Sequence, residues 1–274
     1  MNYFKNKVAV VTGAGSGMGR ALAKILVSRG CSVAICDINE KQLQETTAQL
    51  QNAPVMVTSH VIDVAEVSQL EMLAEQVSKE HGKINLLFNN AGVSVTNTAE
   101  KMPPEDFEWL MNINFWGVVH GCRVFLPYLR QVEAAHIINT SSIFGIIALP
   151  TQSAYNASKF AVRGFTESLR QELQGTPISV SCVHPGGVKT NIVRDSRYTP
   201  ADNESSSKEE FIERFNSMAG LTADEAATII LRGVARKKPR IFVGHDAILI
   251  SILERLFPVY YSTILRRWLN WGGS

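Results

Sequence analysis

Residues 7–19 read KVAVVTGAGSGMG, and this stretch decides the fold. Its first six residues are mostly β-branched or apolar, which is typical of a buried parallel strand. A glycine-dense turn follows directly and contains Gly13, Gly15, Gly17 and Gly19. The spacing of Leu22, Ile25 and Leu26 then predicts a helix. Because glycines let a backbone approach a ligand and the N–H groups at a helix start attract anions, the stretch predicts a phosphate-binding turn.

The spacing of this turn is Thr-Gly-x-x-x-Gly-x-Gly, from Thr12 to Gly19, and it differs from the common G-x-G-x-x-G pattern. A flexible turn is the alternative interpretation, but the position directly after a first strand favours a nucleotide site. A second predicted strand, residues 32–36, ends at Asp37 and is followed by Ile38 rather than by Arg or Lys. A carboxylate at this place accepts hydrogen bonds from an adenosine ribose and repels a 2′-phosphate. The sequence therefore predicts NAD in preference to NADP.

Further strands alternate with helical segments along the chain. Predicted strands cover residues 55–61, 84–88, 135–140 and 178–183, and predicted helices cover residues 40–50 and a segment ending near residue 81. Small or polar residues follow these strands, namely Asp63 and Val64, residues 89–92, Ser141 and Ser142, and residues 184–190. Since parallel α/β sheets bind ligands at the carboxyl ends of their strands, these segments are candidates for the site. Asp63 either caps the next helix or contacts the adenine.

A second informative stretch is residues 142–159, SIFGIIALPTQSAYNASK. Tyr155 and Lys159 lie four residues apart in a segment with helical spacing, so their side chains share one face. A free tyrosine has a pKa near ~10, but a fixed ammonium nearby favours the phenolate, and lowering the pKa by about 3 units corresponds to roughly 4 kcal/mol. The pair is therefore a candidate proton acceptor. Tyr3 and Lys7 have the same spacing, and we interpret them as a solvated N-terminal segment, so context has to distinguish the two pairs.

An asparagine lies inside the long helical segment that begins at Pro104. Pro104 is a good helix start, with acidic residues in the first turn. Asn114 lies in the interior of this helix, where asparagine is a mediocre helix former and usually faces solvent. In the run Asn114-Phe-Trp-Gly117 it indicates a deliberate irregularity in the helix.

Composition adds few constraints. The chain has 274 residues, 45% of them hydrophobic and 19% charged, and a formal charge of +2, which predicts no nucleic-acid partner. The four cysteines, Cys31, Cys36, Cys122 and Cys182, form no C-x-x-C motif and lie in apolar surroundings. They favour reduced core thiols over disulfides, and with no visible export signal they predict a cytoplasmic protein. No metal site is predicted.

Taken together, these segments resemble the short-chain dehydrogenase/reductase superfamily, in its single-domain NAD-dependent branch. The resemblance covers roughly residues 5–244, where the motifs occur in the family's order. It implies an α/β fold of Rossmann type: a doubly wound, mostly parallel seven-stranded sheet with helices on both faces. Residues 240–243 would form the last strand. We expect one domain over residues 1–274.

The resemblance also implies roles for four catalytic residues. Tyr155 would be the general acid/base, and Lys159 would hold the nicotinamide ribose and lower the pKa of the tyrosine. Ser142 would hydrogen-bond the substrate oxygen, and Asn114 would anchor a water linking Lys159 to solvent. The implied cofactor-binding residues are Gly13, Ser16, Gly17, Met18, Gly19, Asp37, Ile38, Asp63, Val64, Asn90, Ala91, Gly92, Tyr155, Lys159, Pro185, Gly186, Val188 and Thr190.

Two segments depart from a minimal domain. Residues 194–220 are polar and have the place of the family's mobile substrate lid. Residues 246–271 form an amphipathic helical extension with a break at Pro258, too short in its uncharged stretches to span a bilayer. We favour packing of this extension on its own subunit or a neighbour, and attachment to a membrane surface is the alternative.

The leading hypothesis is an NAD-dependent dehydrogenase that acts on a small-molecule secondary alcohol or ketone with an apolar body. A cofactor-binding sensor or scaffold without turnover is the second hypothesis, and a peripheral membrane protein acting through residues 246–271 is the third. The resemblance further implies a homodimer or homotetramer assembled through the helices that carry Asn114 and Tyr155.

Overall fold

The β-branched runs of the sequence form a single parallel sheet. The structure, a computed structural model, describes residues 3–198 and 207–268. Within these residues the main sheet has seven strands in the order β3-β2-β1-β4-β6-β7-β9, and every neighbouring pair is parallel. The strands are β1 Val8–Thr12, β2 Ser32–Asp37, β3 Val57–Val61, β4 Leu86–Asn89, β6 Ala135–Thr140, β7 Ile178–Pro185 and β9 Arg240–Val243. The predicted doubly wound α/β sheet is confirmed.

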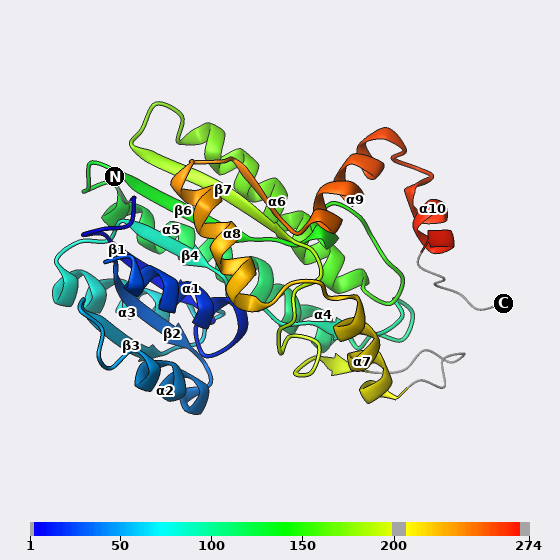
Figure 1. Ribbon diagram of the computed structural model, residues 1–274, viewed down its shortest axis with the longest axis horizontal. Helices are drawn as coiled ribbons and strands as arrows, with labels where there is room; N and C mark the ends of the chain where they lie inside the picture. Colours follow the sequence, from blue (N-terminus) through cyan, green and yellow to red (C-terminus); the bar gives the residue numbers. More distant parts are fainter. Residues whose placement is uncertain (1–2, 199–206, 269–274) are drawn as a thin grey trace.

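Helices cover both faces of this sheet (Figure 1). One face packs on α1 (Gly17–Ser28) and α8 (Ala223–Ala235), and the other packs on α3 (Val67–His81), α5 (Gly117–Leu129) and α6 (Ser153–Glu172). Alternate residues of β1 point to the two cores, since Ala9 and Val11 belong to one cluster and Val8 and Val10 to the other. This burial on both faces explains why the strands read as continuous apolar runs.

The chain reverses its winding direction between β1 and β4, which are neighbours in the sheet. Thr12 joins the carboxyl ends of these two strands: its Oγ1 accepts hydrogen bonds from Asn90 N and Ala91 N, both at 2.9 Å. Asn90 Nδ2 in turn donates to Thr12 O at 3.0 Å. A switch point of this kind opens a crevice above the strand ends, and ligands of α/β sheets bind there.

Two local features go beyond what the sequence predicted. The irregularity expected at Asn114 is a π-helical turn, η1 (Asn112–Trp116), between α4 (Pro104–Met111) and α5. A second sheet pairs two short strands, β5 (Val95–Thr96) and β8 (Arg197–Tyr198). It ties the start of residues 194–220 to the segment after β4.

The remaining elements follow individual strands or lie in the C-terminal part of the chain. Helix α2 (Glu40–Gln49) follows β2, the 3₁₀ turn η2 (Ile143–Gly145) follows β6, and α7 (Lys208–Met218) lies in the predicted lid segment. The extension forms α9 (His245–Leu256) and α10 (Tyr261–Trp268), which project from one end of the molecule (Figure 1). The four cysteines are buried free thiols, as predicted.

Candidate active site

The glycine turn between β1 and α1 forms the floor of the site. Gly13 and Gly17 have left-handed backbones, with φ of 65° and 48°, which glycine adopts without strain. Gly19 lies so close to the Gly13 carbonyl that a Cβ would overlap that oxygen. The turn therefore requires glycine at both ends, and it leaves the first N–H groups of α1 free of side chains.

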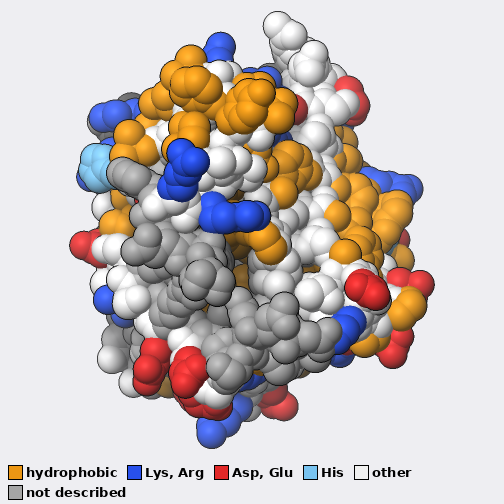
Figure 2. Space-filling model, turned by 90° about the vertical axis from the view of Figure 1, so that its right-hand side faces the viewer, with side chains coloured by type: hydrophobic (Ala, Val, Ile, Leu, Met, Phe, Trp, Pro, Cys, Tyr) orange, Lys and Arg blue, Asp and Glu red, His pale blue; other side chains and the backbone are white. Residues whose placement is uncertain are grey.

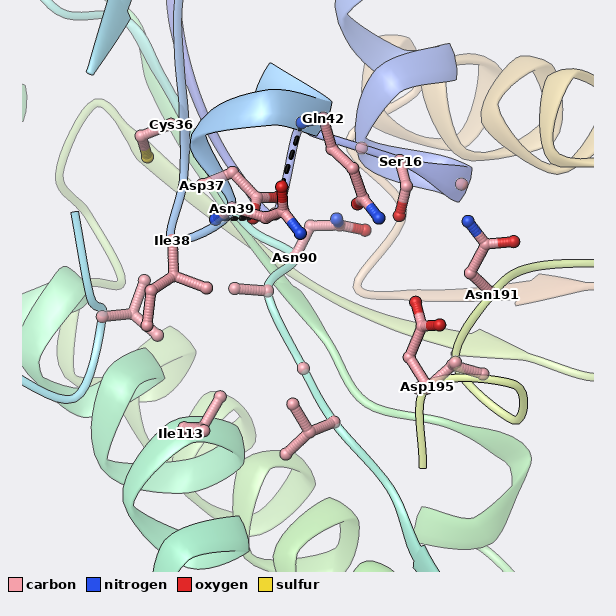
Figure 3. A pocket seen from close by; sticks show the side chains of 18 of the residues that line it. Ser16, Cys36, Asp37, Ile38, Asn39, Gln42, Asn90, Ile113, Asn191 and Asp195 are labelled. Atoms are coloured by element: carbon pink, nitrogen blue, oxygen red, sulfur yellow. Dashed lines mark hydrogen bonds between the residues drawn. The ribbon is translucent and has the colours of Figure 1, made fainter. Parts of the chain in front are cut away.

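A cavity of about 400 Å³ opens above this turn (Figure 3). Thirteen of the predicted cofactor-binding residues line it: Gly13, Ser16, Gly17, Met18, Gly19, Asp37, Ile38, Asp63, Val64, Asn90, Ala91, Gly92 and Thr190. The sequence analysis missed further lining residues, which are Cys36, Asn39, Gln42, Ile62, Val93, Ile113, Asn191, Ile192 and Asp195. Most of these residues are adjacent in the chain to a predicted residue. That adjacency is the signal in the sequence that could have identified them. Gln42, Ile192 and Asp195 are not adjacent in the chain to a predicted residue and had no such signal.

Asp37 lies at the end of β2 and faces this cavity (Figure 3). Its carboxylate accepts hydrogen bonds from Gly15 N at 2.8 Å and Asn39 N at 2.9 Å, which fix the side chain against the glycine turn. Among the described lining residues there is no lysine or arginine. Arg20 lies nearby, but its guanidinium is used by Thr46, Gln42 and Glu45. This end of the cavity therefore has an anionic wall.

Asp63 also lines the cavity, but it does not cap the following helix. Its Oδ1 accepts a hydrogen bond from Ala65 N at 2.9 Å, and the residue at the N-cap position of α3 is Glu66. The capping alternative is therefore wrong, because the chain makes an Asx-type turn before the helix begins.

The residues of this cavity fit a dinucleotide. Asn90 Oδ1 is buried at its edge without a hydrogen-bond partner, which is costly for a polar atom unless a ligand supplies a donor. The glycine turn offers N–H groups at a helix start for a pyrophosphate, and Asp37 offers acceptor oxygens for ribose hydroxyls. The volume also falls within the usual range for small-molecule sites, about 300 to 1,000 Å³.

The four predicted catalytic residues lie beside this cavity rather than in its lining. Gly92 connects the two regions: a Cβ built on it would stand 3.1 Å from Asn114 Oδ1 and 3.4 Å from Lys159 Nζ. Lys159 Nζ lies 5.5 Å from the centre of the Tyr155 ring and donates a hydrogen bond to Thr140 O at 3.2 Å. The ammonium and the phenol are therefore neighbours immediately behind the cavity wall.

Ser142 joins this group from the end of β6. A hydrogen bond between Ser142 and Tyr155 favours the ionised phenol, and Ser142 Oγ accepts from Phe144 N at 3.1 Å. Ser141 anchors the same segment to α6, since its Oγ donates to Lys159 O at 2.8 Å. The strand end and the helix thus hold hydroxyl, phenol and ammonium together.

Burial, and not the expected effect of Lys159, dominates the pKa of Tyr155 in this structure. Burial raises the pKa of Tyr155 to about 12, and the hydrogen bond with Ser142 only partly opposes this. Burial also lowers the pKa of Lys159 to about 8. The physical reason is that both groups are desolvated, so a charge on either is disfavoured. Lys159 is a buried residue, and Tyr155 is half-buried.

Asn114 is fully buried in the π-helical turn. Its Oδ1 accepts from Val93 N at 2.8 Å, and its Nδ2 donates to Val93 O at 2.9 Å and to Ser158 Oγ at 3.2 Å. The widened turn lets this side chain reach the backbone that follows Gly92. Asn114 therefore fixes the segment between the cavity and the catalytic group.

Pro185, Gly186 and Val188 also lie outside the cavity lining, whereas Thr190 lines it. The loop that carries them is held on both sides: Gly186 N donates to Val243 O at 2.9 Å, and Gly187 N donates to Asp246 Oδ2 at 2.7 Å. Val188 is buried and bridges to Leu221. The loop is thus anchored to β9, to the start of α9 and to the end of the lid segment.

His184 lies in the candidate segment 184–190, but the sequence analysis assigned it no role. It is fully buried at the end of β7, and its Nδ1 lies 3.1 Å from Ser142 O. Burial lowers the pKa of His184 to about 4, so the ring is neutral at pH 7 and Nδ1 carries the proton that the carbonyl accepts. His184 therefore holds the backbone of Ser142 from the neighbouring strand.

The fold and this site define a nucleotide-binding α/β protein with a half-buried tyrosine beside a buried lysine, and the comparisons with known proteins agree. The family model described as short chain dehydrogenase matches residues 7–201. One relative is the Mycobacterium tuberculosis protein SadH, which is named as an oxidoreductase. The two sequences are 41% identical over 268 residues, and the match covers 97% of this chain and 96% of that protein.

Solved structures show the same likeness. A short-chain dehydrogenase/reductase from Burkholderia phymatum in complex with NAD superimposes with a TM-score of 0.87 at 32% identity, over 94% of this chain and 96% of that one. Levodione reductase gives a TM-score of 0.78 at 28% identity, over 89% of this chain and 99% of that one. The chain belongs to the short-chain dehydrogenase family. It is accordingly an oxidoreductase of Rossmann type with a site for a nicotinamide nucleotide.

Proposed function

We propose that this protein transfers a hydride between NAD(H) and a secondary alcohol or ketone whose body is apolar. The observation that carries the proposal is the grouping of Ser142, Tyr155 and Lys159 directly behind Gly92, at the edge of a cavity with a glycine turn and Asp37. Alcohol oxidation needs a proton acceptor beside the carbon that loses hydride, and this grouping supplies one.

Each residue has a distinct part in this chemistry. The Tyr155 phenol exchanges a proton with the substrate oxygen: it accepts the hydroxyl proton during oxidation and donates a proton during reduction. Ser142 Oγ holds the same substrate oxygen by a hydrogen bond. Lys159 stabilises the phenolate and binds the nicotinamide ribose, and Asn114 keeps the intervening backbone in place. Bound NAD supplies the nicotinamide ring that takes up or returns the hydride.

The two pKa values fit this division. A phenol with a pKa near 12 retains its proton at neutral pH, and Lys159, with a pKa near 8, is then mostly an ammonium. The resting site is therefore ready to donate a proton to a ketone oxygen. In the oxidation direction, the positive charge of Lys159 favours the phenolate.

An apolar substrate is supported by the surroundings of the phenol. Phe144 contacts the Tyr155 ring edge to face, with centroids 6.0 Å apart. Tyr155 also packs against a buried apolar cluster of Val95, Leu110 and Ala154, which Val93, Met102 and Trp109 join. An alcohol or ketone that approaches Ser142 and Tyr155 would thus meet few partners for additional polar groups.

NAD is favoured over NADP by the anionic wall at Asp37. The carboxylate would accept hydrogen bonds from the two ribose hydroxyls and repel a 2′-phosphate, and no described cavity residue offers a compensating cation. Arg20, in the first turn of α1, already donates to three partners on α2.

The decisive experiment follows nicotinamide absorbance with a panel of secondary alcohols and ketones of graded hydrophobicity. We expect turnover with NAD(H), rising in kcat/KM with the apolar surface of the substrate. Binding of NADH without turnover of any substrate in either direction would instead favour the sensor or scaffold hypothesis. A clear preference for small polar substrates would contradict the apolar pocket.

A further inference from the structure

Helices α9 and α10 form a projecting pair whose inner face is firmly attached to the domain. Ala247 and Leu265 are buried against Ile143, Ile146 and Ile147, in the segment that follows Ser142. Tyr261 Oη also accepts a hydrogen bond from Ala148 N at 3.0 Å. Packing on its own subunit, which the sequence analysis favoured, therefore accounts for one face of this pair.

The opposite face is exposed and apolar. Among the described residues, sixteen large hydrophobic side chains are exposed, and eight of them lie between residues 248 and 264. The most exposed surround the turn between the two helices, with exposed fractions of 66% for Leu256, 75% for Val259 and 67% for Tyr260. We define the C-terminal apolar face as Leu249, Ile252, Leu256, Phe257, Val259 and Tyr260. A concentration of this kind marks an interaction surface.

The charges around this face are mainly positive. Arg255, Arg266 and Arg267 are exposed, whereas Glu254 is half-buried and Asp246 is engaged with Gly187. Figure 2 views the molecule from this end and shows hydrophobic side chains gathered at its upper part beside blue lysine or arginine side chains. An apolar face bordered by arginines has the character of an interfacial helix that lies on an anionic bilayer.

The same charges argue against a second copy of the chain as the occupant. In a two-fold symmetric contact the face would meet itself, so the arginines of both copies would be brought to the border of one interface. Anionic headgroups instead complement these charges, and each basic residue near such a surface contributes about 1 kcal/mol to binding. Within residues 3–198 and 207–268, no helix is long and apolar enough to cross a membrane. The contact would therefore lie at the bilayer surface.

We propose that the C-terminal apolar face docks on an anionic lipid bilayer, with the turn at Leu256 to Tyr260 inserted among the headgroups and Arg255, Arg266 and Arg267 on lipid phosphates. The inner face of the same helix pair packs on the loop whose Phe144 contacts Tyr155. A docked molecule would thus hold this loop one helix layer from the lipid. Resting on the proposed function, this placement favours alcohols and ketones that partition into the bilayer.

The test is co-sedimentation of the full chain with phosphatidylcholine vesicles, with and without phosphatidylglycerol. We expect binding to the anionic vesicles that weakens with salt and with pure phosphatidylcholine. Val259→Glu and Leu256→Glu should each weaken binding by about tenfold or more, because each places a charge where an apolar side chain would be buried. The pair Arg266→Glu and Arg267→Glu should abolish the preference for anionic vesicles.

Met72→Glu is the matched control, because Met72 is an exposed hydrophobic residue on α3, with an exposed fraction of 54%. It should sediment with vesicles as the wild type does. Unchanged thermal unfolding of each variant verifies that it is folded.

Failure of the wild type to bind anionic vesicles would overturn the proposal. Binding of the Val259→Glu variant equal to that of the wild type would overturn it as well. A smaller assembly of Val259→Glu in analytical ultracentrifugation, without vesicle binding by the wild type, would assign the face to a second copy. Since sedimentation needs no substrate, these outcomes are independent of the proposed reaction.

Discussion

Burial works against a charge on Lys159 and against a charge on Tyr155, although the two residues are neighbours. In such a site the loss of hydration raises the free energy of a charged side chain, and a ligand of opposite charge can offset this cost. The folded protein therefore carries a cost for keeping Lys159 protonated, and that cost depends on pH.

Replacing Lys159 with Met removes this cost. The pKa of Lys159 falls from 10.5 to about 8 on folding, so between these values the unfolded chain holds a proton that the folded protein has lost. Wild-type stability should therefore rise by roughly 3 kcal/mol from pH 8 to pH 10.5, and this contribution is absent from the variant. Below pH 8 the Met variant should be the more stable protein. Urea unfolding of both proteins across this window measures the difference, and a difference that does not change with pH would contradict the shift.

Asp37→Asn tests the basis of the NAD preference. The amide keeps the size of the side chain and one acceptor oxygen for Gly15 N or Asn39 N, but it loses the charge that would repel a 2′-phosphate. NADPH affinity relative to NADH should improve by about tenfold, corresponding to ~1.4 kcal/mol. Fluorescence titration with both nucleotides measures this ratio. Glu40→Gln removes an exposed charge nearby that does not line the cavity, and it should leave the ratio unchanged. An unaltered ratio in Asp37→Asn would remove the argument for NAD.

At the residue scale, the sequence alone could predict which pair of residues matters but not their ionisation. The pair Tyr155 and Lys159 was distinguished from Tyr3 and Lys7 only by neighbouring motifs. The interpretation of Tyr3 and Lys7 as solvated is wrong: Lys7 Nζ lies 3.3 Å from the Tyr3 ring centre, and Tyr3 Oη lies 3.3 Å from His136 Nδ1. Burial is set by segments distant in the chain. Neither the contact between Tyr3 and His136 nor the raised pKa of Tyr155 therefore has a signal in the local sequence.

At the scale of elements, the turn between β1 and α1 allows the least change. Gly19→Ala would place a Cβ on the Gly13 carbonyl and near Asn90 Nδ2, so the turn has to open. We expect a loss of about 1 to 3 kcal/mol in the free energy of unfolding, together with weaker NADH binding. Gly220→Ala is the control, because nothing lies within 4 Å of its Cβ position and its backbone is not left-handed. Urea unfolding and NADH titration are the measurements, and equal behaviour of the two variants would contradict the role of the turn.

Elements with a strong local pattern were predicted well. Residues 135–140 and 240–243 coincide with β6 and β9, and the unexpected asparagine at position 114 marks the π-helical turn. The strands β5 and β8 had no such pattern, since each has two residues and they pair across about a hundred positions of the chain. Their pairing depends on where the lid segment returns to the sheet, which is a property of the tertiary fold.

At the scale of the whole molecule, we propose assembly into a homodimer or homotetramer through the helices around Asn114 and Tyr155. Trp116 on η1 and Phe160 on α6 are large hydrophobic residues with exposed fractions of 45% and 41%. Phe160→Glu should therefore shift the assembly toward monomers in sedimentation-velocity ultracentrifugation, because it would bury a charge in the contact. Met72→Glu, on a different helix, should sediment as the wild type does. A wild-type monomer at all concentrations would contradict the assembly.

The arrangement of the whole molecule brings the nucleotide cavity, the predicted catalytic residues and the C-terminal helices to one region. The cavity ends at Gly92, Lys159 and Asn114 lie behind it, and the loop after Ser142 separates Tyr155 from α9 and α10. The sequence indicated the first two parts by motif. The third could not be predicted, because an amphipathic pattern does not reveal which apolar side chains remain uncovered after folding.

The central claim is that the Tyr155 phenol exchanges the proton while the nucleotide site binds independently of it. Its most direct test compares NADH affinity and turnover in the Tyr155→Phe variant, which differs from the wild type by one hydroxyl group. We predict a dissociation constant for NADH within about twofold of wild type and a kcat reduced by about 10²- to 10⁴-fold. A variant that binds NADH and retains near-normal turnover would contradict the account.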